Sequence, residues 1–149
     1  MDIQWRFKSY QELSKIELHD VLILRQQVFV VEQNCPYQDA DEKDKDAHHL
    51  LGYVNDHLVA YLRLVKPGIS YKEMSFGRIV TAPNQRSKGL GVALMKQGIE
   101  HSKKLYGTTL NRISAQTHLL EFYQSFGFQS TGKEYLEDGI PHTQMLLSK

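Results

Sequence analysis

Two short stretches of the sequence carry residue types that suit the binding and reaction of an anionic ligand. The first, NQRSKGLGVALM at residues 84–95, places Arg86, Lys88, Gly89 and Gly91 directly ahead of a helix-like run. Glycines let a backbone approach a ligand closely, and a helix N-terminus offers free N–H groups and a partial positive charge. A basic, glycine-bearing loop in this position predicts an anion site, and phosphate is the usual ligand of such sites.

The spacing of this loop excludes two common phosphate motifs. The Walker loop requires G-x-x-x-x-G-K-[ST], which the stretch does not contain. The dinucleotide fingerprint requires a third glycine where this chain has Leu94. The pattern that remains is [QR]-x-x-G-x-[GA], and the residues that fill it are Arg86, Ser87, Lys88, Gly89, Leu90 and Gly91. Taken alone, this pattern is explained equally well by a solvated turn between a strand and a helix.

The second stretch is EFYQSFGF at residues 121–128, about thirty residues after the loop. With the strand-like IVTA and Pro83 ahead of the loop, the two stretches resemble the acyl-coenzyme A (acyl-CoA) loop and the aromatic helix of the GNAT acetyltransferase superfamily. The segments VFVVEQNCPYQDAD, HHLLG and EDGIPH resemble its ElaA branch, so the resemblance extends from about residue 20 to about residue 146.

The resemblance implies a fold and a cosubstrate. It predicts one domain over residues 1–149 with the mixed α/β GNAT acyl-CoA N-acyltransferase fold, a twisted mixed sheet flanked by helices whose two central parallel strands splay apart. Acetyl-CoA would lie in that gap, with its pantetheine arm against one strand and its pyrophosphate at the glycine loop. The positions that the resemblance assigns to the cosubstrate are Ile79, Val80, Thr81, Arg86, Ser87, Lys88, Gly89, Leu90, Gly91, Val92, His118 and Tyr123.

The implied reaction is the direct transfer of an acetyl group to a primary amine within a ternary complex. Tyr123 occupies the position of the family's general acid and would protonate the departing thiolate. Because a thiol has a pKa of about 8.5, the thiolate already leaves readily, and Tyr123→Phe should slow the reaction rather than abolish it. The amine needs a base, and His142 and Glu32 are the catalytic candidates, with His118 and Glu73 as further possibilities.

Several of these residues also have a purely structural explanation. Tyr123 belongs to an apolar cluster at helical spacing, which is typical of a core aromatic. His118 suits the start of a helix, and His142 follows a turn where a surface role is the default. Arg25 and Glu32 lie seven residues apart on one predicted helix face, so an ion pair or a cap explains them as well as substrate binding does.

Residues 38–47 form an acidic loop that contains Asp39, Asp41, Glu42, Asp44 and Asp46. It does not fit the EF-hand pattern, because Lys43 stands at the fifth position and no glycine at the sixth. We predict a solvated loop, with attraction of a cationic amine as a weaker hypothesis. Cys35 is the single cysteine, which excludes an internal disulfide and a multi-thiolate metal site, and no metal is predicted.

The composition sets broad limits on function. The formal net charge of +1 provides no global basic field for nucleic acid or an anionic membrane. The first residues lack the basic and apolar regions of a secretory signal, and the longest apolar runs are too short to span a bilayer. These features favour a cytoplasmic protein with an amine substrate, and homodimers are common on the implied fold.

The pattern of elements shows how the chain would position the two stretches. A helix is predicted over residues 14–33, with Ser14 and Glu17 at capping-box spacing and an apolar stripe that includes Arg25. The remaining predicted elements are hairpins around Asn55-Asp56 and Asp138-Gly139, strands over 73–82 and 111–116, a helix over 90–106 with Val92, Met95 and Ile99 on one face, and a short helix ending at Gly127. The adjacent His48 and His49 should point to opposite faces of a strand, one buried and one exposed.

Two other functions are compatible with the same fold. One is a regulatory module that binds acyl-CoA without catalysis. Alternatively, RQQVFVVEQ faintly resembles the autoinducer-synthase branch, which the short chain and the intact acyl-CoA loop disfavour.

Overall fold

The computed structural model describes residues 2–148. Its strands are β1 (Gln4–Ser9), β2 (Ala47–Val54), β3 (His57–Val65), β4 (Ser75–Thr81), β5 (Asn111–Gln116), β6 (Gln129–Glu137) and β7 (Ile140–Leu147). The helices are α1 (Lys15–Arg25), which continues as a π-helical segment (Gln26–Glu32), α2 (Leu90–Tyr106) and α3 (Leu120–Gln124). Short 3-10 turns occupy Tyr10–Glu12, Glu42–Asp46, Pro83–Gln85 and Thr117–Leu119.

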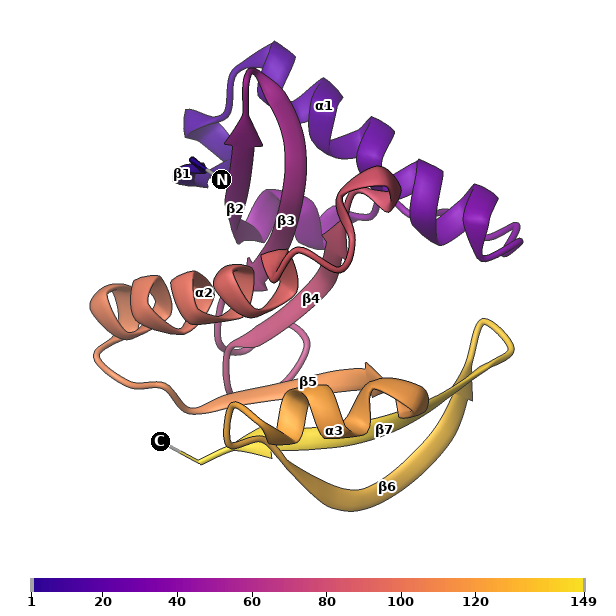
Figure 1. Ribbon diagram of the computed structural model, residues 1–149. Coiled ribbons are helices and arrows are strands. Elements are labelled where there is room, and N and C mark those ends of the chain that lie inside the picture. Colours follow the sequence, from indigo (N-terminus) through magenta and orange to yellow (C-terminus); the bar gives the residue numbers. More distant parts are fainter. Residues whose placement is uncertain (1, 149) are drawn as a thin grey trace.

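The strands form two antiparallel groups that meet at one parallel junction. The first group has the order β1-β2-β3-β4, and the second has the order β5-β7-β6. Met74 and Asn111 form a parallel bridge between them, supported by the Arg112 N–H donating to the Met74 carbonyl over 3.1 Å. Beyond this junction β4 and β5 diverge, as Figure 1 shows. The predicted mixed α/β architecture with splayed parallel strands is therefore confirmed.

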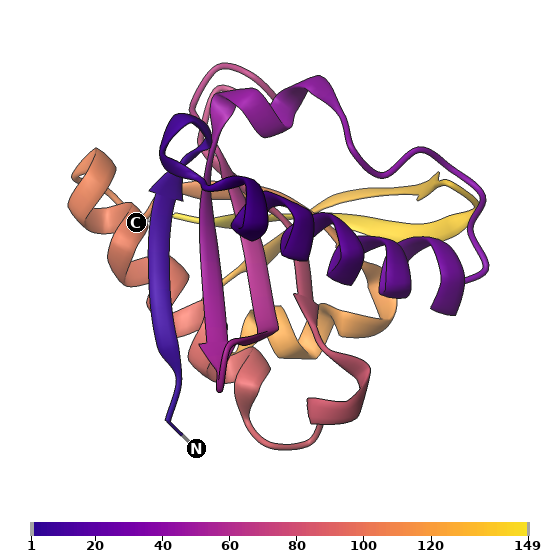
Figure 2. The same cartoon turned by 90° about the horizontal axis from the view of Figure 1, so that it is seen from above.

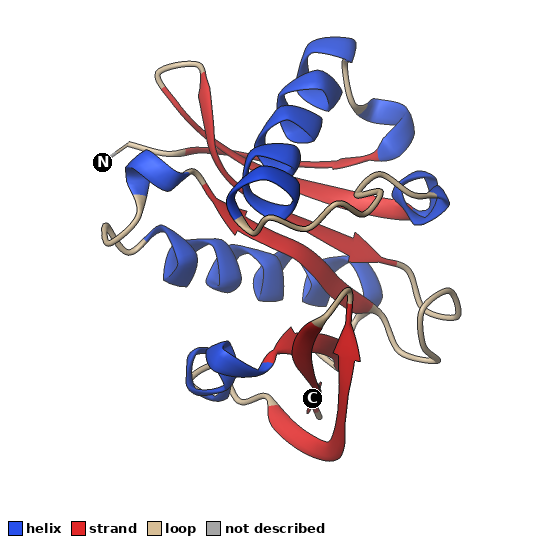
Figure 3. Cartoon of the chain, turned by 90° about the vertical axis from the view of Figure 1, so that its right-hand side faces the viewer, coloured by secondary structure: helices blue, strands red, loops and turns tan. Residues whose placement is uncertain are grey.

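Helices cover both faces of the first group of strands (Figure 3). Neighbouring residues of β2 show how the alternation of a strand divides the core, because Leu50 packs in the cluster beneath α2 and Leu51 in the cluster beneath α1. Gly98 sets the distance of α2 from the sheet, since a Cβ there would come within 2.8 Å of the Leu62 side chain. The helix that carries the glycine loop is thus held close against β3 and β4.

Most of the predicted elements are confirmed. Ser14 and Glu17 form the predicted capping box, with the Glu17 N–H donating to Ser14 Oγ over 3.0 Å. Asn55-Asp56 and Asp138-Gly139 turn the two hairpins with positive φ values, as tight hairpins require. The helix over 90–106 and the strand over 111–116 have the predicted bounds.

Two local expectations are wrong. No strand was predicted for the N-terminal segment, yet β1 pairs with β2, and the alternation of Trp5 and Phe7 with polar residues is the signal of this strand. Val92 was expected to share an apolar helix face with Met95 and Ile99. It is 42% exposed, whereas Met95 is buried against the sheet together with Leu94 and Gly98. No described helix is long and apolar enough to cross a membrane.

The loop after α1 reaches the tip of the β6–β7 hairpin, which Figure 2 shows from above. Cys35 is buried there, and its Sγ lies 3.5 Å from the Asp138 carbonyl. Gln33 and Gln116 approach each other to 3.5 Å between their amide groups. These contacts connect the first and second groups of strands on the side where β4 and β5 are farthest apart.

Candidate active site

A cavity of about 400 Å³ lies between the two groups of strands. Its lining includes Ile79 from β4, Ile113 from β5, Tyr123 from α3 and His142 from β7. One edge of β4 pairs with β3. Within residues 2–148, the only β-bridge on the edge that faces β5 is the one between Met74 and Asn111. Strand backbone is therefore available to a ligand along this cavity.

Three residues predicted for the site, Ile79, Tyr123 and His142, line the same cavity. Burial raises the pKa of the Tyr123 phenol above its ordinary value, so this group keeps its proton at neutral pH. Val80 turns its side chain into the core beneath α1, and Thr81 pairs with Ala60. Any contact that Val80 makes with a ligand in this cavity must therefore come from its backbone.

The glycine loop lies at the N-terminus of α2, outside the lining of this cavity. Gly89 caps the helix in the left-handed conformation with φ of 76°, and Ser87 has φ of 66°. The first N–H groups of α2 have no partner within the helix and point out of its end. Gly91 faces α3, where an added Cβ would lie 3.4 Å from the Phe122 ring. The two sequence stretches are thus neighbours in space, and the anion site adjoins the aromatic helix.

Arg86 and Glu32 form a two-pronged ion pair across the loop, with N···O distances of 2.6 and 2.7 Å. Both side chains are about two-fifths exposed, at 41% and 42%. The hydrogen bond from Arg86 lowers the pKa of Glu32. The structure therefore separates Glu32, a predicted base, from Tyr123 and His142 and places it beside the anion loop.

Two further base candidates also lie outside the cavity lining. Glu73 accepts two hydrogen bonds from Arg112, at 2.9 and 3.0 Å, and these lower its pKa to about 2. His118 is an exposed residue of the 3-10 turn ahead of α3. Of the predicted bases, His142 is the one that the fold brings to the same cavity as Tyr123.

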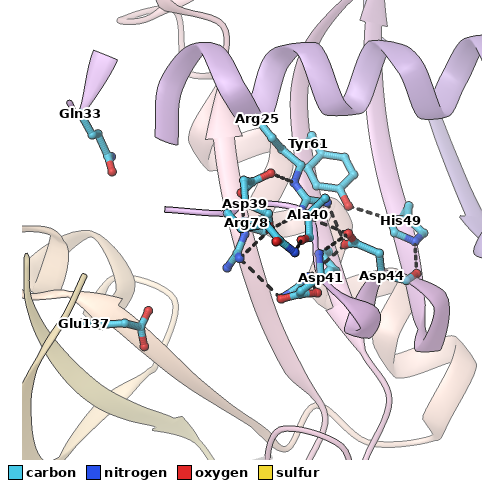
Figure 4. A network of polar contacts seen from close by, with 12 residues as sticks. Arg25, Gln33, Asp39, Ala40, Asp41, Asp44, His49, Tyr61, Arg78 and Glu137 are labelled. Carbon is cyan, nitrogen blue, oxygen red and sulfur yellow. Dashed lines mark hydrogen bonds and ion pairs between the residues drawn. The ribbon is translucent and has the colours of Figure 1, made fainter. Parts of the chain in front are cut away.

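One wall of the cavity contains a network of three arginines and three aspartates, which we call the arginine wall (Figure 4). It consists of Arg25, Arg63, Arg78, Asp39, Asp41 and Asp44. Arg25 is 1% exposed and donates to Asp39 over 2.7 Å and to Asp44 over 2.8 Å. Burial raises the pKa of Asp44, but Arg25 and Arg63 outweigh it, so the pKa lies below its ordinary value. The network is balanced in charge.

This arrangement corrects two expectations. The acidic loop is not simply solvated, because Asp39 and Asp44 are buried and ion-paired. Arg25 pairs with that loop and not with Glu32, which belongs to Arg86. Local spacing suggested a partner seven residues away, whereas the π-helical segment and the returning loop supply partners 14 and 19 residues away.

A β-bulge brings Arg78 into the arginine wall. Two residues of β4, Arg78 and Ile79, face one residue of β3, and Arg78 has φ of 51°. Its guanidinium donates to the Asp39 carboxylate over 2.8 Å and to the Asp39 carbonyl over 2.9 Å. Because a left-handed arginine is costly, these bonds hold the bulge in place, and the bulge turns Ile79 into the cavity.

His49 lies behind the arginine wall and is fully buried. Its Nε2 lies 2.9 Å from the Asp44 carbonyl, which can only accept, so Nε2 carries the proton and Nδ1 accepts from the Tyr61 hydroxyl over 2.6 Å. Burial lowers the pKa of His49 to about 4. One of the two histidines was expected to be buried and the other exposed; His49 is buried, but His48 is half-buried and not exposed.

The opposite wall is the polar side of the second group of strands, which we call the hairpin face. It consists of Ser114 of β5, Tyr135 and Glu137 of β6, and His142 of β7. The Tyr135 hydroxyl donates to Ser114 Oγ over 2.6 Å, and Ser114 Oγ lies 3.3 Å from Glu137 Oε1. His142 Nδ1 donates to the Ile140 carbonyl over 2.7 Å, so its Nε2 is directed at Glu137 Oε2, 3.5 Å away.

Arg78 and Glu137 are two charged cavity residues that were not among the predicted site residues. No local pattern signals the bulge at Arg78. The position of Glu137 could have been predicted from the sequence. The two-residue Asp138-Gly139 turn fixes the strand register, and this register places Glu137 on the same face as His142. Within residues 2–148, no group of three or more His, Cys, Asp or Glu residues could hold a metal ion.

Comparisons with known proteins agree with this geometry. Residues 10–149 match the acetyltransferase (GNAT) domain family. The chain is 42% identical to the protein ElaA of Escherichia coli, over 96% of this chain and 95% of that protein. A UPF0039 protein of Synechocystis is 44% identical, over 98% of this chain and 96% of that protein.

Solved structures show the same fold. An acyl-CoA N-acyltransferase from Pseudomonas aeruginosa superposes with a TM-score of 0.94 at 39% identity, covering 99% of this chain and 100% of that one. An acyl-homoserine lactone synthase shares the fold alone, with a TM-score of 0.79 at 16% identity over 99% of this chain and 85% of that one. Family and fold both support an acyltransferase that uses a CoA-type cosubstrate and an amine acceptor. The chain belongs to the GNAT acetyltransferase family.

Proposed function

We propose that this chain transfers an acetyl group from acetyl-CoA to a primary amine by direct attack within a ternary complex. The observation that carries the proposal is the cavity between β4 and β5, which brings Ile79, Tyr123 and His142 together beside free strand backbone. The strands diverge on the side away from the Met74–Asn111 bridge, and this divergence would give two substrates access to the cavity.

The residues present fit acetyl-CoA at both of its ends. The N–H groups at the start of α2 and the Arg86 guanidinium would bind the pyrophosphate, with Gly89 and Gly91 permitting close approach. The backbone of residues 79–81 would pair with the pantetheine arm and donate an N–H to the oxyanion that forms at the thioester carbonyl. Arg86 would exchange the Glu32 carboxylate for phosphate oxygens.

Two side chains would move the protons. His142 Nε2 carries a free lone pair in the tautomer that the Ile140 carbonyl imposes, so it can accept a proton from the attacking amine. The amine nitrogen bonds to the carbonyl carbon, the carbon–sulfur bond breaks, and the sulfur takes a proton from the Tyr123 phenol. Burial keeps that phenol protonated until the thiolate forms.

Calorimetric titration with acetyl-CoA, followed by an assay for thiol release in the presence of primary amines, tests the proposal. We expect micromolar binding by the natural protein and at least tenfold weaker binding by Arg86→Glu, because reversal places a negative charge beside the phosphates. Lys103→Glu is the matched control, since it reverses an exposed charge at the other end of α2. Absence of binding by the natural protein would refute the proposal, and binding without acyl transfer would indicate a regulatory acyl-CoA-binding module.

A further inference from the structure

We propose that Glu137 binds the ammonium group of the acceptor and holds it beside His142, which selects cationic aliphatic primary amines as acceptors. This inference rests on the proposed function and adds to it the acceptor site and the acceptor class. Arginines already neutralise the cavity carboxylates of the arginine wall, whereas within residues 2–148 no arginine neutralises Glu137.

The carboxylates of the arginine wall are committed to arginines. Asp39 is bound by Arg25 and Arg78 at 2.7 and 2.8 Å, and Asp41 by Arg63 at 2.7 Å. A cationic substrate at this wall would have to displace a guanidinium from its carboxylate. The acidic loop is therefore a poor site for an ammonium group, although its sequence suggested one.

Glu137 lines the same cavity, but no arginine of the described residues pairs with it. Within residues 2–148, the Glu137 carboxylate has polar contacts with a hydroxyl, Ser114 Oγ at 3.3 Å, and with an imidazole nitrogen, His142 Nε2 at 3.5 Å. Neither is a permanent cation. Its side chain is 49% exposed, so an incoming amine can reach it, whereas the His142 side chain is only 8% exposed. In Figure 4 the Glu137 carboxylate lies across the cavity from Asp39 and Arg78.

The fold fixes this pair in place. Strand register puts Tyr135 opposite His142 and Glu137 opposite Ile140, so Glu137 and His142 share one face of the hairpin. The Tyr135 and His142 rings stack with centroids 6.2 Å apart. Tyr135 and Ser114 form a chain of hydrogen bonds that ends at Glu137. The hairpin face thus presents a carboxylate outward with a proton acceptor directly behind it.

This order suits the chemistry of the acceptor. At pH 7 an aliphatic amine of pKa about 10.4 is almost entirely protonated, so it must bind as an ammonium ion and lose a proton before it attacks. Glu137 would bind the ion and His142 Nε2 would take its first proton, which leaves the nitrogen lone pair to form the bond to the acetyl carbon. The second proton would leave the nitrogen as the carbon–sulfur bond breaks and would restore the Tyr123 phenol, which has given its own proton to the sulfur. The imidazolium that results lies beside the Glu137 carboxylate, which balances its charge. An acceptor with a carboxylate next to its amine would be repelled by Glu137.

Binding of hexylamine to the protein saturated with CoA tests the inference without depending on turnover, and 1-hexanol serves as the uncharged probe. We expect the natural protein to bind hexylammonium at least tenfold more tightly than hexanol at pH 7. Glu137→Gln should weaken hexylammonium binding about tenfold, as for the loss of a charge-assisted hydrogen bond, and leave hexanol binding unchanged. Glu134→Gln is the matched control, since it lies on the same strand but on the opposite face.

Two further readouts sharpen the result. With hexylamine as the acceptor, Glu137→Gln should raise KM more than it lowers kcat, and Glu137→Asp should recover part of the affinity. Equal hexylammonium affinity of the natural protein and Glu137→Gln overturns the inference. If acetyl-CoA still binds and is turned over in that case, the proposed function stands and only the acceptor site is refuted.

Discussion

Both walls of the cavity contain carboxylates, but the two walls differ in how these carboxylates are paired and how far they are exposed. The arginine wall buries four of its six charged side chains and pairs every carboxylate with an arginine. The hairpin face leaves Glu137 half-exposed, beside a histidine and a serine. Burying an unpaired charge is costly, so the first wall is ion-paired throughout and is structural. A charge that stays near water can remain free for a substrate.

Two histidines show the same contrast. His49 donates from Nε2 to the Asp44 carbonyl and accepts at Nδ1 from Tyr61, so both ring nitrogens are used. His142 donates from Nδ1 to the Ile140 carbonyl and directs Nε2 toward Glu137. The first ring is fixed and neutral, whereas the second keeps a proton-accepting atom at the cavity. Hydrogen-bond partners, more than residue type, therefore distinguish a structural histidine from a reactive one.

Breaking the arginine wall should have the largest effect. Arg25→Ala would leave Asp39 and Asp44 buried beside an empty space, and we expect it to lower the free energy of unfolding by about 3–5 kcal/mol. Lys45→Ala is the control, because Lys45 and Glu42 form an exposed pair that should contribute almost nothing. Denaturant unfolding measures both, and a loss of less than about 1 kcal/mol for Arg25→Ala would show that the wall is not structural.

The pH dependence of stability should come next in size. The pKa of His49 is lowered from 6.5 to about 4 in the folded protein, so the unfolded chain binds the proton first. Stability is therefore complete above pH 6.5 and falls as the pH drops toward 4, by at most about 1.4 kcal/mol per pH unit from this group. Unfolding measured over this range should show a flatter dependence for His49→Gln.

His57→Gln is the control for this measurement, because His57 is exposed at the start of β3. It should leave the pH dependence unchanged. If His49→Gln has the same slope as the natural protein between pH 6.5 and 4, then His49 is not the buried neutral group that the structure shows.

The smallest effect is expected at the ion pair between Arg86 and Glu32. Like the arginine wall it pairs a carboxylate with an arginine, but like Glu137 it is partly exposed. Phosphate would have to replace Glu32 at Arg86, so Glu32→Gln should tighten acetyl-CoA binding, by about two- to fivefold for a pair of this exposure. Calorimetry measures the change, and Glu42→Gln is the control at another exposed carboxylate. Weaker binding by Glu32→Gln would mean that Glu32 positions Arg86 rather than competing for it.

Much of the fold follows from local patterns in the sequence. The Ser14–Glu17 capping box, the Asn55-Asp56 and Asp138-Gly139 turns, and the bounds of α2 and β5 each depend on residues close together in the chain. β1 was missed because a short edge strand has only a weak alternation to identify it. Val92 was misplaced because its helix has two candidate apolar faces, and the close approach at Gly98 selects one of them.

The sequence by itself determined the anion loop, the aromatic helix and the resemblance to the GNAT family, because each is a contiguous motif whose chemistry lies in its own residues. Only the tertiary structure decided which charges are free. Arg25 finds partners 14 and 19 residues away, Glu32 binds Arg86 across 54 residues, and Glu137 meets His142 through strand pairing. Electrostatic interactions act through space, so the state of a carboxylate depends on neighbours that only the fold brings together.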